Sequence, residues 1–219
     1  MNAFLGLILF IVFLGGILLL LNMHARTGFS TTGMKIHRAV PAPWNLTEFL
    51  RLKPSRWKIG EYYLFCEETV RSLGHRFVGR FDSAILHWEE APVLDIVMEY
   101  KFPVNHLPEQ RRQEDIFQAG LYALALMETG VSCSSTRLVT IYCLQDKASR
   151  CVEGKSSTSC WNCGDSKIFT NRFNPHYAIK TLKRLDEVWY KGRKPKPTLE
   201  RQRCRVCPYS RDKCNYSTV

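Results

Sequence analysis

Acidic residues are scarce in this sequence, with 20 Asp and Glu against 31 Lys and Arg in 219 residues and a formal net charge of +11. A surface with that imbalance attracts polyanions such as nucleic acid or an anionic membrane face. The sequence also contains no internal repeat. With 45% apolar and 12% aromatic residues, it can bury the core of one soluble domain.

Charge is absent from residues 3–21, which are dominated by Leu, Ile, Phe and Val. A helix of about 20 apolar residues crosses the hydrocarbon core of a membrane. The charged start and small-x-small cleavage site of a removed secretory signal are also missing. We therefore expect residues 1–22 to be a transmembrane anchor, with a signal peptide as the alternative. Arg26, Lys35 and Arg38 follow the span, so the positive-inside tendency places the soluble part in the cytoplasm.

The rest of the chain has three expected parts. Residues 23–56 have loop-type composition without a sustained period, which predicts a linker. A folded domain is expected at 57–192, starting near Trp57, and a basic cysteine-containing segment at 193–219. Residues 191–214 contain nine Lys and Arg against two acidic residues, which suits contact with nucleic acid, although a solvated tail has the same composition.

Local patterns predict a mixed α/β fold of the α+β type, a central sheet flanked by helices. A helix from Pro175, with Asn174 as N-cap, is expected to end at Gly192. The other helices are expected at 61–73 and 113–127, and strands at 76–86, 93–102, 137–144 and 167–173.

Five residues in the middle of the chain form an ordered set of polar side chains. Asp82 lies in GRFD, and Glu99 and Lys101 follow in the apolar run VLDIVMEYKF. Gln118 and Tyr122 lie four apart in QAGLY, within the helix predicted next. A single Glu-x-Lys pair is more often a surface ion pair, but here it ends an apolar strand, where unpaired charge would be costly.

These residue types suit phosphodiester hydrolysis, in which a metal ion holds a water and offsets charge on the phosphate. Mg²⁺ and Mn²⁺ prefer carboxylate oxygens, which Asp82 and Glu99 can supply. Glu99 and Lys101 share a strand face, so Lys101 can orient the water or stabilise developing charge. Gln118 and Tyr122 share a helix face and can brace Lys101 or contact nucleic acid.

The stretches GRFD, MEYK and QAGLYALAL resemble the PD-(D/E)XK nuclease superfamily, and within it the RecB-like branch that includes CRISPR-associated exonucleases. The resemblance covers about a quarter of the chain, residues 76–128. It implies a restriction-endonuclease-like fold, DNA as the substrate and exonuclease action. It also implies that the metal and catalytic core consists of Asp82, Glu99 and Lys101. The two supporting residues would be Gln118 and Tyr122.

Two positions of that family pattern stay open in this sequence. Asp95 shares the parity of Glu99 along the predicted strand, so it is either a ligand or the polar start of the strand. The upstream histidine of the family has two candidates, His37 and His75, and neither lies in a convincing match.

The C-terminal cysteines form a second motif, in which Cys204-x-x-Cys207 is followed by Cys214. In a reducing compartment, clustered cysteines favour metal binding over disulfides. Some members of the RecB-like branch join a similar trio to one upstream cysteine around a four-iron cluster, and Cys66 is the candidate here. The resemblance therefore implies a 4Fe–4S cluster, with Zn²⁺ as the first alternative and unmetallated thiols as the second.

A further group consists of Cys160 and Cys163, with Cys151 nearby, in an expected insertion between strands. It can bind zinc, act as a redox pair, supply the fourth ligand of the C-terminal site, or be exposed loop thiols. Cys133 and Cys143 are expected to be ordinary half-buried residues.

The combined expectation is a membrane-anchored, Mg²⁺- or Mn²⁺-dependent DNA nuclease, with its soluble domain at the cytoplasmic face. One alternative is a catalytically inactive nucleic-acid-binding protein of the same fold. Another is a membrane-anchored iron–sulfur or zinc redox protein centred on the cysteines.

Overall fold

The computed structural model describes residues 2–53, 56, 58–151, 160–161, 163–194, 201–210, 214–215 and 217. The chain divides into two compact units, Met1–Ala178 and Ile179–Val219. The sequence placed a boundary at 192, whereas the structure divides the chain after Ala178. Trp57, the predicted start of the folded domain, lies outside the described residues.

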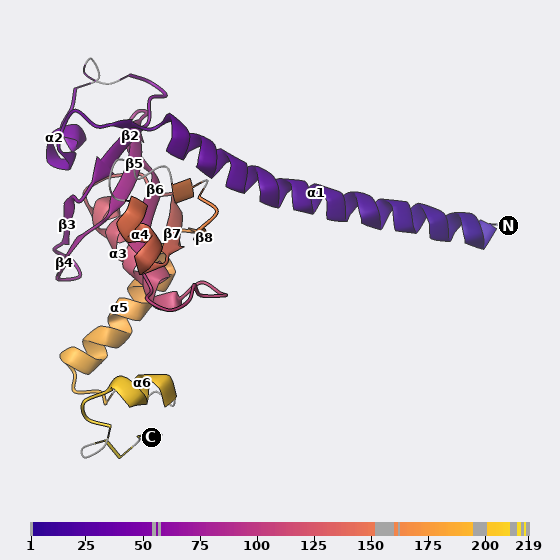
Figure 1. Ribbon diagram of the computed structural model, residues 1–219. Coiled ribbons are helices and arrows are strands. Elements are labelled where there is room, and N and C mark those ends of the chain that lie inside the picture. The colour runs from indigo at the N-terminus through magenta and orange to yellow at the C-terminus, as the bar shows by residue number, and fades with distance from the viewer. Residues whose placement is uncertain are drawn as a thin grey trace. The chain divides into compact units, whose positions relative to one another are not determined.

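The first unit contains a six-stranded mixed sheet in the order β1-β2-β5-β6-β7-β8 (Figure 1). The pairs β1–β2 and β6–β7 are parallel, and the other neighbours are antiparallel. These strands are β1 (Val40–Pro41), β2 (Tyr63–Cys66), β5 (Ser83–Trp88), β6 (Pro92–Lys101), β7 (Arg137–Cys143) and β8 (Ser166–Arg172). A separate two-stranded sheet pairs β3 (Thr69–Ser72) with β4 (Phe77–Arg80). The helices of this unit are α1 (Asn2–Arg38), α2 (Leu46–Leu50), α3 (Gln113–Glu128) and α4 (Gln145–Cys151).

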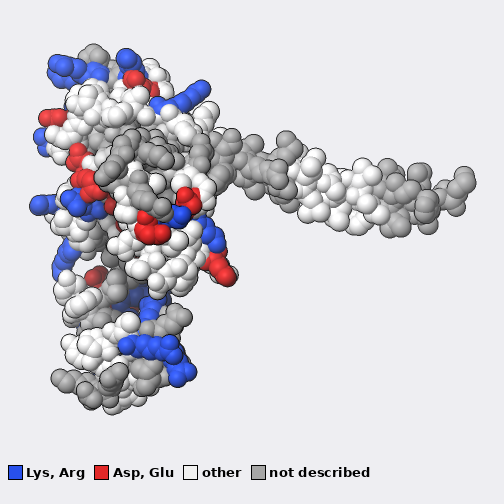
Figure 2. All heavy atoms as spheres, viewed as in Figure 1, with Lys and Arg blue, Asp and Glu red and all other residues white. Residues whose placement is uncertain are grey.

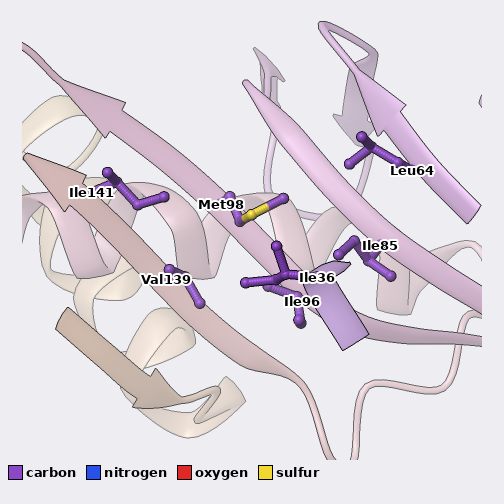
Figure 3. Packing of buried hydrophobic residues seen from close by; sticks show 7 residues of the cluster. All are labelled: Ile36, Leu64, Ile85, Ile96, Met98, Val139 and Ile141. Carbon is purple, nitrogen blue, oxygen red and sulfur yellow. The ribbon is translucent and has the colours of Figure 1, made fainter. Parts of the chain in front are cut away.

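Strand β6 lies inside the sheet and alternates between two covered faces. Ile96 and Met98 point into a buried apolar cluster that also contains Ile36 from α1 (Figure 3). The other members of the cluster are Leu64, Ile85, Val139 and Ile141. Residues of the opposite parity, including Glu99, face the side on which α3 packs against β6 and β7. The predicted mixed α/β architecture, a sheet flanked by helices, is confirmed.

Several predicted elements are confirmed almost to their ends. The strands predicted at 93–102, 137–144 and 167–173 correspond to β6, β7 and β8, and the helix at 113–127 corresponds to α3. Gly130 follows α3 with a φ of 91°, the left-handed conformation expected where glycine ends a helix.

The helix predicted at 61–73 is wrong, because these residues form β2 and β3. Tyr63 and Phe65 are buried in the sheet, and Glu67 between the two strands has a φ of 56°. Aromatic residues of this kind fit a pleated surface. The apparent helical spacing of the apolar residues came from two short strands that meet at a sharp turn.

The linker predicted at 23–56 is also wrong in its described residues. Helix α1 runs through it to Arg38, and Ile36 is 1% exposed. Strand β1 pairs with β2, and Phe49 of α2 is fully buried among aromatic rings. Tertiary contacts order this segment, and such contacts leave no period in the sequence.

Helix α5 (Pro175–Trp189) begins in the first unit and continues in the second, which also contains α6 (Arg201–Val206). The Tyr177 N–H donates to Asn174 Oδ1 at 3.3 Å, so the predicted N-cap at Asn174 is confirmed. Gly192 has a φ of 67° after the helix, which confirms the predicted stop.

The apolar residues 3–21 lie within α1. The described side chains among them are exposed, including Phe13 at 67% and Leu20 at 66%. A search of the residues that the structure describes finds no helix long and apolar enough to cross a membrane.

Gly33 allows α1 to pack closely against Trp161. A Cβ atom at Gly33 would overlap the Trp161 indole, so we expect Gly33→Ala to cost about 1–3 kcal/mol of unfolding free energy. Gly16→Ala is the matched control, because a Cβ there meets nothing within 4 Å. Urea unfolding of the full chain in mild detergent measures both, and equal midpoints for the two variants would contradict this packing.

Candidate active site

Glu99 and Lys101 lie at the carboxyl end of β6 and share one face of the strand. Across the parallel pair, Glu99 is opposite Thr140 and Lys101 is opposite Tyr142 of β7. Helix α3, which connects β6 to β7, covers this face and brings Gln118 over the two charged residues.

A hydrogen-bonded network connects four of the predicted site residues. The Lys101 ammonium donates to Glu99 Oε1 at 2.8 Å and to Gln118 Oε1 at 2.8 Å. The Gln118 amide N–H groups donate to Glu99 Oε1 at 2.7 Å and to the Tyr122 hydroxyl at 2.8 Å. Gln118 therefore holds the ion pair from the helix side, which is one of the two roles that the sequence left open for it.

Asp82 joins this group from the junction between β4 and β5. The strand predicted at 76–86 is broken here, so Asp82 lies between the two sheets. Its carboxylate Oδ2 accepts from the Tyr100 N–H at 2.6 Å, and its carbonyl accepts from the Glu67 N–H at 3.1 Å. Burial raises the pKa of Asp82, partly offset by the Tyr100 hydrogen bond.

Asp82, Glu99, Lys101, Gln118 and Tyr122 are together called the acidic site below. Glu99 is its most buried carboxylate, at 3% exposure. Burial, with a smaller contribution from the Asp82 charge, raises the pKa of Glu99 to about 7, although the Lys101 hydrogen bond lowers it. The buried Glu99 Oε2 has no hydrogen-bond partner among the described residues.

An unpartnered buried carboxylate oxygen carries a free-energy cost, which a cation at Oε2 would relieve. Mg²⁺ keeps several waters and is often held by only one or two carboxylates, so Asp82 and Glu99 form a compatible donor set. Within the described residues there is no group of three or more Cys, His, Asp or Glu side chains placed to hold a metal ion. The residues present thus fit a hydrated hard cation rather than an all-protein coordination sphere.

The sequence analysis missed two residues beside the site, Asp115 and Tyr142. Asp115 is 8% exposed, and its Oδ1 lies 3.8 Å from the Lys101 ammonium. The Tyr142 hydroxyl donates to Asp115 Oδ2. The spacing of Asp115 from Gln118 and Tyr122, at i, i+3 and i+7 on one helix face, is the signal that would have identified it.

Asp95 does not belong to the site. Ile85 pairs with Ile96, whereas Leu86 pairs with Leu94, so Asp95 is the extra residue of a β-bulge in β6. Its buried carboxylate forms an ion pair with Lys35 of α1 and also contacts His87 Nδ1. The assumption that Asp95 shares the parity of Glu99 fails because the bulge shifts the alternation.

The two histidine candidates lie on other elements than the acidic-site residues. His75 lies beyond β3, with Nδ1 at 2.5 Å from Glu128 Oε1 near the end of α3. His37 lies in the last turn of α1. Neither residue has a described contact with Asp82 or Glu99.

Tyr122 lies where strand β4 approaches helix α3 closely. A Cβ atom at Gly79 of β4 would lie 2.6 Å from Tyr122 Cε1, and the Phe81 ring is 6.4 Å from the Tyr122 ring. Burial raises the pKa of Tyr122, although the hydrogen bond from Gln118 lowers it. Gly79 therefore leaves the space that the Tyr122 ring occupies.

The cysteines predicted to hold a cluster belong to both units. Cys66 ends β2, is exposed, and has its Sγ 3.6 Å from Ser83 Oγ. Cys204 is buried in α6, and the Cys207 N–H donates to its carbonyl at 3.2 Å. Cys214 lies beyond α6 and is half-buried. An iron–sulfur or zinc centre on these cysteines stays a prediction.

No protein-family model, curated protein or solved structure matches this chain. The resemblance to PD-(D/E)XK nucleases therefore stays a prediction that rests on short motifs. The geometry of Glu99, Lys101 and Gln118 carries the functional argument that follows.

The raised pKa of Glu99 predicts a specific dependence of stability on pH. Between about pH 4.5 and 7 the folded state keeps the Glu99 proton that the unfolded chain loses, so the free energy of unfolding falls as pH rises. The loss is at most about 3 kcal/mol. Urea unfolding in the presence of a chelator, at about pH 5 and about pH 8, measures it.

Glu99→Gln is the matched control, because the amide does not titrate and the size of the side chain is kept. The decrease in stability over this pH range should be smaller in the variant than in the wild type. An identical pH dependence of the two proteins would show that Glu99 ionises normally.

Proposed function

We propose that this protein is a metal-dependent nuclease that hydrolyses phosphodiester bonds in DNA at the acidic site. The observation that carries the proposal is the state of the Glu99 carboxylate. One of its oxygens accepts hydrogen bonds from Lys101 and Gln118, and the other is buried without a partner. A carboxylate held in this way is oriented by its neighbours and available to a cation.

A Mg²⁺ or Mn²⁺ ion bound by Asp82 and Glu99 would supply a polarised water and offset charge on the phosphate. The Asp82 and Glu99 carboxylates also repel each other, because the charge of Asp82 raises the pKa of Glu99. This mutual repulsion favours cation binding over a structural role for the pair.

Lys101 is the residue suited to act on the reacting phosphate. Its side chain is 25% exposed, whereas that of Glu99 is 3% exposed, so the ammonium is held from one side and open on the other. There it can donate to a non-bridging phosphate oxygen or to the attacking water. Gln118 restricts the Lys101 side chain, and Tyr122 in turn fixes the Gln118 amide.

The described fold supports the finer assignment, a restriction-endonuclease-like domain. An acid-x-Lys pair ends an internal strand, and the next helix places a Gln and a Tyr over it. Asp82 enters from the junction just before β5. The order Asp, Glu-x-Lys, Gln-x-x-x-Tyr is the order that the resemblance implies, and we infer exonuclease action from that resemblance.

Basic residues support DNA as the substrate. In the second unit, Lys and Arg gather around α6 (Figure 2). Their charges would neutralise backbone phosphates without reading sequence. We further propose that residues 3–21 anchor the chain to a membrane, with the acidic site at the cytoplasmic face, and that the cysteines of the second unit hold an iron–sulfur cluster or zinc.

Replacement of Lys101 or Asp82 should abolish cleavage while the protein stays folded. We expect Lys101→Met and Asp82→Asn to lower the rate of Mn²⁺-dependent DNA cleavage by at least about 100-fold. The first removes the positive charge that acts on the reacting phosphate, and the second removes a carboxylate that holds the cation. Lys58→Met is the control, since Lys58 is a surface residue paired with Glu61 at 3.9 Å. Cleavage of end-blocked and free-ended DNA by the full chain measures the rates, with thermal unfolding as the test of folding.

Unchanged cleavage in both variants would remove the acidic site from the reaction. DNA binding by the wild type without cleavage under Mg²⁺ or Mn²⁺ would instead favour a nucleic-acid-binding protein of the same fold. Degradation of free-ended but not end-blocked DNA is the result expected of an exonuclease.

A further inference from the structure

Four cysteines lie in the segments around the end of β7 and the start of β8. Cys143 is the last residue of β7, and Cys151 is the last residue of α4, which follows β7 directly. Cys160 and Cys163 form a Cys-x-x-Cys turn just before β8. These four residues are called the four-cysteine cluster.

Strand alternation places Cys143 on the same sheet face as Cys160. Val139 and Ile141 belong to the apolar cluster on the α1 side of the sheet, and Cys143 has their parity in β7. Cys160 and Trp161 pack against that same cluster. The exposed-loop interpretation of Cys160 is therefore wrong, because the residue is half-buried against the core.

Ser166 fastens the Cys-x-x-Cys turn directly beside Cys143. In the pairing of β7 with β8, Cys143 is opposite Ser166. The Ser166 hydroxyl donates to the Cys160 carbonyl at 2.9 Å and to the Cys163 carbonyl at 3.0 Å. The Cys163 N–H also donates to the Cys160 carbonyl at 3.2 Å, which closes the turn.

Helix α4 follows β7 after a single residue and ends at Cys151. The helix begins two residues after Cys143, where the Gln145 N–H donates to the Pro103 carbonyl at 3.1 Å. Helix α4 has seven residues and is therefore only about 10 Å long, so Cys151 stays near the end of β7.

We propose that Cys143, Cys151, Cys160 and Cys163 form a structural Zn²⁺ site. Four thiolates complete a tetrahedral coordination sphere, and a Cys-x-x-Cys turn is a common source of two of them. In the described residues the side chains are not gathered into a ready coordination sphere. Binding must therefore draw the sulfurs together, as metal binding commonly does when it is coupled to local folding.

The site would fix the end of β7 from the side opposite the acidic site. Tyr142 precedes Cys143 and points to the other face, where its hydroxyl donates to Asp115. Trp161, within the Cys-x-x-Cys turn, packs against Gly33 of α1. A zinc ion here would join α4, the end of β7 and the start of β8. It can be detected whether or not the protein is a nuclease.

The test measures zinc in a chain whose C-terminal cysteines cannot contribute. The background carries Cys204→Ala, Cys207→Ala and Cys214→Ala, and we expect about one Zn²⁺ per chain by elemental analysis. Adding Cys160→Ala and Cys163→Ala should remove the zinc. Adding Cys133→Ala should keep it, because buried Cys133 bonds the Ala123 carbonyl at 3.5 Å and belongs to another part of the core.

Cobalt substitution keeps the test decisive if the double variant fails to fold. Co²⁺ in the background chain should give the charge-transfer and visible bands of a tetrahedral thiolate site. Cys143→Ser should weaken the charge-transfer band in proportion to one lost sulfur of four. A folded background chain without zinc, zinc retained after loss of Cys160 and Cys163, or iron in place of zinc would each overturn the proposal.

Discussion

Strand β6 is covered on both faces, and this constraint governs the packing of the first unit and the environment of its buried charges. Ile96 and Met98 bury their side chains against Ile36 of α1 on one face. On the other face, helix α3 covers Glu99 and Lys101. Burying a carboxylate is costly unless a cation and donors compensate, so the position of α3 and the identity of Gln118 are tied to the charges beneath them.

The charge of Glu99 is only partly compensated, and this supports the proposed cation site. Lys101 and Gln118 both donate to the same oxygen, Oε1, and leave Oε2 buried without a partner among the described residues. A structural ion pair would be expected to satisfy both oxygens. Elsewhere on the same strand, the buried Asp95 uses both of its oxygens, one with Lys35 and one with His87. The contrast distinguishes a carboxylate with both oxygens paired from one with an unpaired oxygen.

The parts predictable from sequence were those controlled by local pattern. β6 and α3 follow from a long apolar run and a run rich in Ala and Leu, so the set from Glu99 to Tyr122 could be placed in advance. The bulge at Asp95 and the burial of Phe49 could not, because both depend on partners distant in sequence. The position of Cys143 beside the Cys-x-x-Cys turn could not be predicted for the same reason, because it comes from the pairing of β7 with β8.

The proposed function depends on the binding of a divalent cation by Asp82 and Glu99. Electron paramagnetic resonance measures it directly, because the signal of free Mn²⁺ decreases when the ion binds, and hard Mn²⁺ prefers carboxylates to thiolates. We expect wild-type protein at about pH 8 to decrease the signal of free Mn²⁺, and the double variant Asp82→Asn, Glu99→Gln to decrease it much less. Equal loss of the signal with both proteins would contradict it.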